Sequence, residues 1–375
     1  MRAIQTERKA AAVARARERG LPVRVERPDG TVQEVVELDE TGEPLYFTTH
    51  NVNAAISTGA DVLRTVTGLT GSGVVIGMWD GASGRATHQE FGGGRMVVKD
   101  GSASGDHATH VGGTMIGSGV LASARGMAVA ATVDSYDWNS DTSEFIARAA
   151  TGPGQADKLP ISNHSYGYVR GWNWDGSRWV WQGTSGTSAS SIETNFGVYN
   201  SRARAIDAIV YDAPYYLMFW SSGNERSNNP GSGSTVSVGG SLVTYDPALH
   251  PAGDGVYRGG FETVADNAVS KNVVVVGAVT DAVTSGVRDA TKANVTAFTS
   301  WGPADDGRIK PDVVANGDGL YSSLNSNDSA YGTFSGTSMS SPNAAGTAGL
   351  LIHHYGNLFP GAAMRASTLK GLLIH

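Results

Sequence analysis

Apolar runs of strand length alternate with helix-like segments through most of the chain after residue 73. Continuous apolar strands separated by helices are typical of a parallel sheet covered by helices on both faces. The pattern therefore predicts an α/β fold, a three-layer sandwich with a mostly parallel central sheet. The predicted strands are Val74–Trp79, Val133–Asp137, Ile161–His164, Tyr215–Ser221 and Val273–Val279. The predicted helices between them are Ala108–Gly117, Ser143–Ala150 and Val198–Tyr211.

The first 48 residues follow a different pattern. Thr6–Arg19 is rich in helix formers. Val23–Val36 and Val35–Thr48 each alternate around a turn sequence, which is typical of hairpins. The sequence therefore predicts a small helix and hairpin segment at 1–48 and a main domain at 49–375. The two predicted turns are Pro28–Gly30 and Asp39–Gly42.

A stretch without charged residues near the C-terminal end predicts a buried helix, with Ser338 at or just before its N-terminus. Pro342 lies four residues further on, and proline is tolerated in the first turn of a helix because its N–H is not needed there. The helix is predicted to continue to about His354. A hydroxyl at this end of a buried helix lies where free N–H groups and the helix dipole stabilise a developing oxyanion. An ordinary serine N-cap explains the same pattern.

Composition narrows the class of protein. With 40% hydrophobic and 17% charged residues, the chain is typical of a globular protein, and its 50 glycines indicate many tight turns. The absence of cysteine excludes disulfides and thiolate metal sites. A net charge of −7 argues against a nucleic-acid partner. No run reaches the roughly 18 apolar residues of a membrane span, and the basic start lacks the apolar segment of an intact signal peptide.

Two polar sites follow the first predicted strand. Asp80 ends that strand before Gly81, where a carboxylate can orient another side chain, although a simple Asp-Gly turn explains the same residues. His107 and His110 lie one turn apart at a helix start, so they share a face and a zinc pair has to be considered. The sequence has no His-Glu-x-x-His pattern and no obvious third ligand. We therefore favour His107 as a base and His110 as a packed structural histidine.

A third site is Asn224, which follows the strand Tyr215–Ser221. Its amide can donate to an oxyanion, although a turn asparagine is the alternative.

Chain order helps to choose between known folds. An α/β-hydrolase nucleophile requires Gly-x-Ser-x-Gly with an acid after it, whereas position 340 is serine and no Asp or Glu follows Ser338. A dinucleotide-binding fold is also unsuitable, because its glycine motif does not follow the first strand.

The remaining order of acid, base and hydroxyl resembles that of the subtilisin family of serine proteases (subtilases), in particular its larger bacterial secreted members. Ile161–Gly167 resembles the family's substrate-binding strand, and Arg308–Ala315 resembles the segment before the nucleophile. The resemblance extends over about residues 70–375. It rests on four separated motifs, Val74–Asp80, His107–Thr114, Ser222–Asn224 and Gly336–Pro342.

The resemblance implies a serine endopeptidase that forms an acyl-enzyme. Ser338 would be the nucleophile, His107 the base, and Asp80 the group that orients His107. Asn224 and the Ser338 N–H would bind the oxyanion. No metal or other cofactor is expected in the chemistry. Structural calcium is compatible with the resemblance, and loops at Asp318 or Asp328 offer oxygen ligands, but the sequence assigns no site.

Ser165, Tyr166 and Gly167 are expected to pair with an extended peptide, beside Ser222 and Gly223. The following segment, Trp172–Trp181, has four tryptophans around an Asp-Gly turn and predicts a hairpin. Either the tryptophans form a wall of the substrate cleft, or they are a cross-strand cluster that stabilises the hairpin. The preferred cleavage residue stays open, because Glu225 favours basic side chains and the aromatic surroundings favour apolar ones.

Four positions depart from the usual family pattern without replacing a catalytic group. Gly81 stands where Ser or Thr is usual, Ala108 where Gly is usual, Asn316 where Pro is usual and Asn343 where His is frequent. The chain stops at His375 within what is expected to be the last long helix, so the main domain is expected to lack its final segment.

Polypeptide substrates, a secreted or cell-envelope location, and no membrane span are further expectations from the resemblance. Residues 1–48 are expected to be either an N-terminal extension or a short pro-segment, removed by self-cleavage near Thr48–Asn51. The alternative function is a subtilase-like binding or scaffold protein whose activity is lost or blocked by this segment.

Overall fold

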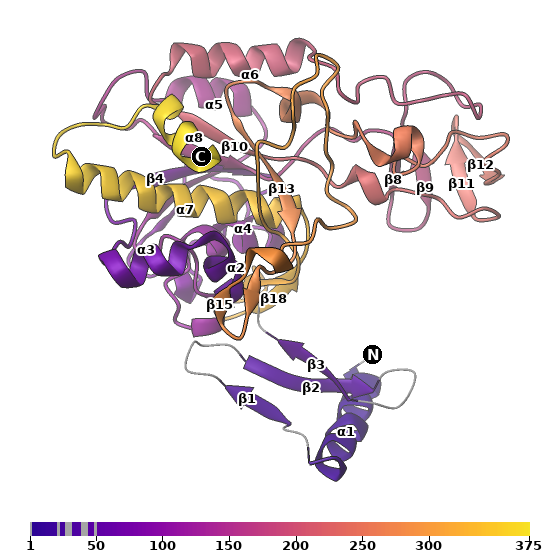
Figure 1. The fold of residues 1–375 in the computed structure, drawn as a ribbon, viewed down its shortest axis with the longest axis horizontal. Coiled ribbons are helices and arrows are strands. Elements are labelled where there is room, and N and C mark those ends of the chain that lie inside the picture. The colour runs from indigo at the N-terminus through magenta and orange to yellow at the C-terminus, as the bar shows by residue number, and fades with distance from the viewer. Residues whose placement is uncertain (1, 21–22, 27–31, 39–43, 49–50) are drawn as a thin grey trace.

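A seven-stranded sheet, in which every neighbouring pair is parallel, forms the centre of the computed structural model (Figure 1). The structure describes residues 2–20, 23–26, 32–38, 44–48 and 51–375. The strand order is β16-β13-β10-β7-β4-β6-β5. All five predicted strands belong to this sheet, so the predicted α/β fold is confirmed. The strands are β4 (Val75–Asp80), β5 (Met96–Val98), β6 (Thr132–Asp137), β7 (Ile161–His164), β10 (Leu217–Ser221), β13 (Val274–Val279) and β16 (Val313–Asn316).

Helices cover both faces of the sheet, because successive strand residues point to opposite sides. On β4, Ile76 and Met78 join a core with α4 and α7, whereas Trp79 joins a second core with α5 and α6. Helices α2 and α3 lie on the α7 side, and Figure 1 shows α5 and α6 on the opposite side. The helices of the main body are α2 (Asn51–Thr58), α3 (Ala60–Thr67), α4 (Asp106–Ile116), α5 (Asp141–Arg148), α6 (Ser201–Asp212), α7 (Thr337–Leu358) and α8 (Ala366–Ile374).

The predicted uncharged helix is α7, which is buried along most of its length and crosses α4 at close range. A Cβ added at Gly346 would lie 3.0 Å from the Met115 carbonyl oxygen and 2.8 Å from Met127 Cβ. Glycine is therefore required for this approach of the helix to its neighbours. The helix continues four residues beyond the predicted end at His354.

The N-terminal unit has its own small core, separate from those of the main body. Helix α1 (Arg2–Glu18) packs on an antiparallel sheet in the order β1-β2-β3, with Ala12, Ala16 and Val35 buried between them. The predicted helix and the two hairpin pairings are therefore present. The predicted turns at Pro28–Gly30 and Asp39–Gly42 lie outside the described residues. The strands are β1 (Arg24–Glu26), β2 (Val32–Leu38) and β3 (Pro44–Thr48).

A four-stranded sheet, in the order β12-β11-β9-β8, extends from the main body between β7 and β13 (Figure 1). The predicted tryptophan hairpin forms its β8 and β9 strands, which pair Trp172 with Trp181 and Trp174 with Trp179. Trp172 and Trp181 are buried against Tyr245 in the core of this small sheet. Its strands are β8 (Trp172–Trp174), β9 (Trp179–Trp181), β11 (Thr235–Val238) and β12 (Ser241–Thr244).

Two short hairpins and several single helical turns complete the described chain. The hairpins are β14 (Val283–Thr284) with β15 (Val287–Arg288) and β17 (Leu320–Ser323) with β18 (Tyr331–Phe334). The 3₁₀ turns are η1 (Gln89–Phe91), η2 (Ala122–Ala124), η3 (Glu225–Ser227), η4 (Tyr257–Gly260), η5 (Asp266–Val269) and η6 (Ala290–Lys292).

The loop that follows α4 is held by one buried carboxylate. Glu90, on η1, is fully buried and accepts hydrogen bonds from the backbone N–H groups of Gly119 (2.6 Å), Val120 (3.2 Å) and Leu121 (2.9 Å). The Tyr331 hydroxyl donates to the same carboxylate at 2.8 Å. Because buried polar groups without partners are costly, Glu90 fixes both the end of α4 and β18.

We expect Glu90→Ala to lower the free energy of unfolding by about 3 kcal/mol or more, because several buried donors lose their acceptor. Chemical denaturation measures this change. The matched control is Asp212→Ala, an exposed acid at the end of α6 whose removal is expected to cost less than about 1 kcal/mol. Equal losses for the two variants would contradict the assigned role of Glu90.

Candidate active site

The predicted site residues lie at one edge of the central sheet, where its parallel strands end. Asp80 ends β4, Ser165 follows β7, and Asn224 lies three residues after β10. Helix α7 brings Ser338 to the same edge in its first turn. Such edges are where functional groups gather in parallel sheets.

A row of stacked rings crosses the sheet one residue before this edge. Trp79 pairs in register with Tyr136 and His164, and His164 pairs with Trp220. The ring centroids are 4.5 Å, 5.5 Å and 4.4 Å apart along the row. The next residues on three of the strands are Asp80, Ser165 and Ser221. The row therefore fixes how the ends of these strands are aligned with one another. Sequence analysis missed this role, although each ring is in a predicted strand.

Asp80 and His107 are in direct contact. The His107 Nδ1–H donates to Asp80 Oδ1 at 2.8 Å and Oδ2 at 2.9 Å, and the Gly81 N–H donates to Oδ1 at 2.7 Å. Burial lowers the pKa of His107, but the hydrogen bond and charge of Asp80 outweigh it, so the net pKa is raised above 6.5. The buried carboxylate thus holds one ring nitrogen and leaves Nε2 for other chemistry.

The Ser338 hydroxyl is bound to the predicted substrate strand. It donates to the Ser165 carbonyl oxygen at 3.1 Å, and Ser165 Oγ donates to the Ser338 carbonyl oxygen at 2.9 Å. Among the described residues, which include both side chains, no hydrogen bond joins Ser338 to His107. The Ser338 hydroxyl has to turn away from the Ser165 carbonyl oxygen to contact His107. Catalytic hydrogen bonds commonly form only when substrate is bound.

The Asn224 side chain is held at its oxygen end. Its Oδ1 accepts from the Thr337 N–H and hydroxyl, both at 3.0 Å, so the NH₂ group is the end that remains for binding. A Cβ added at Gly336 would lie 3.6 Å from Asn224 Nδ2 and 3.7 Å from Ser338 N. The two donors therefore border one small space, which Gly336, with φ 153°, keeps open. The φ angle also favours glycine here.

A pocket of about 170 Å³ opens beside Ser338 and Asn224, and we call it the site pocket. All five predicted substrate-binding residues line it, namely Ser165, Tyr166, Gly167, Ser222 and Gly223. Asn173 is the only residue of the tryptophan hairpin in the lining. None of the four hairpin tryptophans lines this pocket, and Trp172 and Trp181 face the core of the small sheet, as the cross-strand interpretation predicts.

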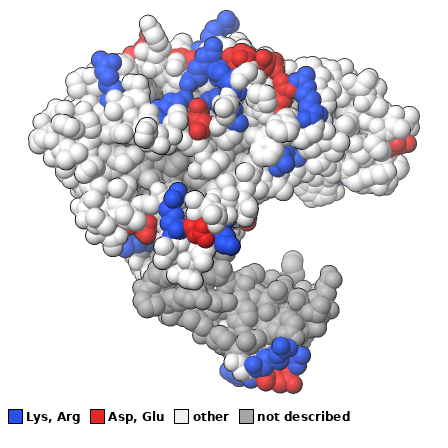
Figure 2. Space-filling model, viewed as in Figure 1, with Lys and Arg blue, Asp and Glu red and all other residues white. Residues whose placement is uncertain are grey.

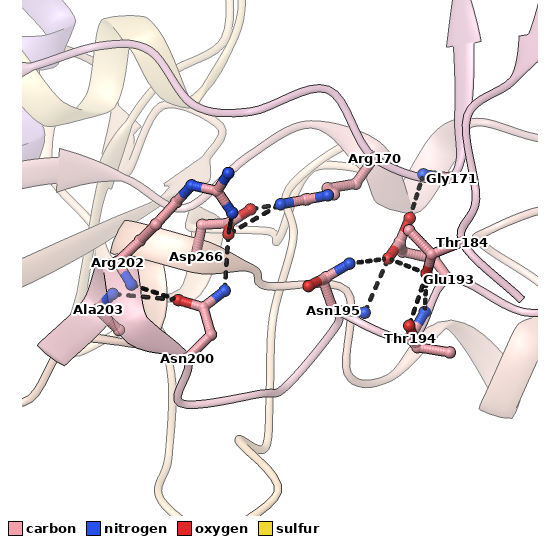
Figure 3. Close-up of polar contacts among 10 residues, drawn as sticks. All are labelled: Arg170, Gly171, Thr184, Glu193, Thr194, Asn195, Asn200, Arg202, Ala203 and Asp266. Carbon is pink, nitrogen blue, oxygen red and sulfur yellow. Dashed lines mark hydrogen bonds and ion pairs between the residues drawn. The ribbon is translucent and has the colours of Figure 1, made fainter.

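An ion pair joins two walls of the site pocket (Figure 3). Arg170 donates to the buried Asp266 carboxylate through Nε at 2.7 Å and a terminal nitrogen at 2.9 Å. Asn200 Nδ2 donates to the same carboxylate at 2.7 Å. Nearby, Glu193 accepts from the N–H groups of Gly171 and Asn195. Sequence analysis missed this arrangement, because 96 residues separate Arg170 from Asp266.

His110 is a packed side chain away from these groups. It is fully buried, its ring stacks on Phe334 at 4.6 Å, and Nε2 lies 2.9 Å from the Leu320 carbonyl oxygen. Burial lowers its pKa to about 3.

Of the loops considered for calcium, Asp328 pairs with Arg85 at 2.6 Å. Across the described ranges, no three acidic or histidine side chains are grouped to hold a metal ion.

Asn316 and Asn343, two of the four positions that depart from the usual family pattern, are in contact next to α2. Asn343 Nδ2 donates to the Asn316 carbonyl oxygen and to that of Ala54 on α2, each at 3.4 Å. Asn316 Nδ2 in turn donates to Asp281, which also accepts from Asn53 on α2. These bonds fasten α2, which begins at Asn51, to the helix that carries Ser338.

Comparison with known proteins finds a matching sequence family. The sequence model of the subtilase family matches residues 90–375, a range that begins after Asp80. The chain is 44% identical over 71 residues to the C5a peptidase of Streptococcus pyogenes, which covers 19% of this chain and 6% of that protein. It is 36% identical over 111 residues to the serine protease AprX of Bacillus subtilis, covering 26% and 24% respectively. The chain thus spans a small part of these relatives.

Solved structures share the fold. The CspB protease of Clostridium perfringens superposes with a TM-score of 0.55 at 14% sequence identity, over 84% of this chain and 91% of that one. At this identity the likeness concerns the fold alone.

We expect the His107 imidazole to titrate above 6.5 in the wild type and below 6.5 in Asp80→Asn, because burial remains while the carboxylate charge is lost. NMR titration, with the signal assigned from His107→Gln, measures both values. The pair stabilises the fold below pH 6.5, and this contribution disappears as pH rises through the raised pKa. The control is Asp106→Asn, because the Asp106 carboxylate accepts from the Asn325 N–H and not from the His107 ring. It should leave the His107 titration in place. An unchanged pKa in Asp80→Asn would contradict the prediction.

Proposed function

Because the chain belongs to the subtilase family, we propose that it is a serine endopeptidase that uses Asp80, His107 and Ser338 and passes through an acyl-enzyme. The observation that carries this proposal is the Asp80–His107 contact at the sheet edge that also holds Ser338 and Asn224.

In the proposed reaction, Ser338 Oγ attacks the carbonyl carbon of the scissile peptide while His107 Nε2 takes its proton. Asp80 keeps the other ring nitrogen protonated and stabilises the imidazolium that forms. The tetrahedral intermediate collapses, the C–N bond breaks, and His107 returns the proton to the leaving amine. Water then hydrolyses the acyl-enzyme by the same route. Asn224 Nδ2 and the Ser338 N–H would bind the oxyanion throughout.

We propose that the substrate backbone lies along Ser165–Gly167 as an added strand. A peptide N–H that bonds to the Ser165 carbonyl oxygen competes with the Ser338 hydroxyl for this acceptor. Binding of substrate would then release the hydroxyl towards His107, which explains how a resting contact with the substrate strand is compatible with catalysis.

Polypeptides are the proposed partners, and a secreted or cell-envelope location is proposed from the family resemblance. Figure 2 shows acidic side chains interspersed among the basic ones on this face, rather than a continuous basic surface. No described helix is long and apolar enough to cross a bilayer. Residues 1–48 are proposed to be a pro-segment, supported by their separate core and by the attachment of α2 to α7 from Asn53 onward.

We expect one organophosphonate adduct on the wild type and none on Ser338→Ala, because only an activated hydroxyl attacks the phosphorus atom. Intact mass spectrometry measures this, and the same spectrum shows whether the N-terminal segment has been removed. A folded wild type without an adduct would contradict the proposed activity and favour the binding-protein alternative.

We expect Asn224→Ala to lower kcat strongly with little change in KM, because its amide donates to the oxyanion only as charge develops. The loss known for such a donor in subtilisin is about 10²–10³-fold in kcat. Steady-state kinetics on a peptide substrate measures it, with Asn357→Ala, an exposed asparagine near the far end of α7, as the matched control. Equal kcat values in the two variants would remove Asn224 from this role.

A further inference from the structure

A second pocket, of about 490 Å³, lies at the edge of the central sheet opposite the candidate active site, and we call it the rear pocket. Gly73 leads into β4, Pro160 into β7 and Tyr215 into β10, and all three border it. The far end of α7 and the start of α8, which packs against α7, form its other side (Figure 1). Pockets of roughly 300–1,000 Å³ are typical of sites that bind a small molecule. The rear pocket has this size and shares no described residue with the site pocket.

The lining of the rear pocket offers positive charge and hydrogen-bond donors but no acid. Among the described residues, it includes Lys158 and His353 and contains no Asp or Glu. The chain as a whole has a net charge of −7, so the sign of this lining is opposite to that of the whole protein. A lining of this kind complements a negatively charged group.

The Lys158 ammonium has donors to spare. Its Nζ donates to the Ala147 carbonyl oxygen at 2.5 Å. An ammonium group has three N–H donors, so two are left for another partner. Within the described part of the chain, no carboxylate lies within ion-pair distance of Lys158. The charge is therefore available to an anion in the rear pocket.

The His353 ring supplies a further donor. Its Nδ1 accepts from the backbone N–H of Gly71 at 3.2 Å and of Thr70 at 3.4 Å. A ring nitrogen that accepts carries no proton, so the proton of the neutral imidazole is on Nε2. Nε2 has no acceptor among the described residues, and the ring lines the rear pocket. His353 and Lys158 thus offer an N–H and an ammonium to the same space.

Much of the remaining lining suits a hydrocarbon chain. Val74 lies before β4, Ile352 is on α7, and Met364 and Leu369 lie before and on α8. Burying methylene groups against such side chains removes them from water, which is favourable.

A peptide chain fits this lining less well, because its N–H groups need acceptors. The Gln155 carboxamide oxygen is an acceptor in the lining, but it already receives the Thr151 N–H and hydroxyl and the Gly152 N–H. A hydrocarbon chain needs no acceptor. The lining therefore favours a ligand with one anionic end and an aliphatic remainder.

We propose that the rear pocket binds an amphipathic carboxylate of the fatty-acid class, with its carboxylate on Lys158 and His353 and its chain along the apolar side chains. The inference does not depend on the proposed peptidase function. A bound ligand would join the near ends of β4, β7 and α7, the elements that bring Asp80, Ser165 and Ser338 to the opposite edge. It would therefore stabilise the folded state as its concentration rises.

Three small molecules test the inference by isothermal titration calorimetry on the whole chain. Octanoate carries the charge and the chain, 1-octanol the chain alone, and acetate the charge alone. We expect the wild type to bind octanoate at least about tenfold more tightly than 1-octanol, because only the carboxylate forms charge-assisted hydrogen bonds with Lys158. Acetate is expected to show no measurable binding. Octanoate should also raise Tm at concentrations where acetate does not.

Two variants locate the binding. Lys158→Gln is expected to lower the affinity for octanoate at least about tenfold and to leave that for 1-octanol unchanged, because it removes only the charge. Ala363→Trp fills the pocket from its lining and is expected to abolish the binding of both. The matched control is Lys292→Gln, an exposed lysine on η6, which should keep the wild-type affinities.

Several outcomes would overturn the inference. If the wild type does not bind octanoate, or binds 1-octanol equally well, the inference fails without any variant, so poor folding of a variant does not leave the question open. Wild-type affinity for octanoate in folded Lys158→Gln or Ala363→Trp would place the binding elsewhere. Tighter binding of acetyl-dileucine, which has a free carboxylate, than of octanoate would identify a peptide C-terminus as the occupant instead.

Discussion

Hydrogen bonds between the first turn of α7 and the strand ends hold the candidate site together. Thr337 is bound to Asn224, Ser338 to Ser165, and Ser341 Oγ donates to Asn163 at 2.7 Å. The helix is buried from its first residue to Leu350, apart from a partly exposed Ser338, so it cannot shift without breaking a large core. The proposed nucleophile, oxyanion donors and substrate strand therefore share one rigid frame.

Helix α7 is also bonded to α2. The Asn343 and Asn316 contacts tie α2 to α7, and they use two positions that differ from the usual family pattern. A polar side chain in such a place has to find partners, since a buried amide without them is costly. Here the partners come from α2, which explains why this early helix belongs with the main body although sequence analysis did not predict it.

Sequence analysis predicted the strands that have long apolar runs and the polar residues that follow them. These signals are local, so Asp80, His107, Asn224 and Ser338 were singled out as candidates by position, and the resemblance to subtilases assigned their roles. Strands of three or four residues carry little periodicity, so β5 and β16 were missed, although the equally short β7 was predicted. The Glu90 carboxylate and the Arg170–Asp266 pair were missed for a different reason. Their partners are distant in the chain, and nothing in the neighbouring residues indicates them.

Apart from Thr337 and Ser338, the site pocket is built from parts of the chain that do not carry the proposed triad. Its walls come largely from 165–173, 220–228 and 265–268, which lie between β7 and β13 and include the connections to the small sheet. Asp80, His107 and Ser338 lie outside that region, on β4, α4 and α7. Substitutions between residues 168 and 268 that spare Asn224 can therefore change the pocket while Asp80, His107 and Ser338, the proposed reacting groups, are inherited unaltered. Substrate choice and chemistry are free to evolve at separate rates in this architecture.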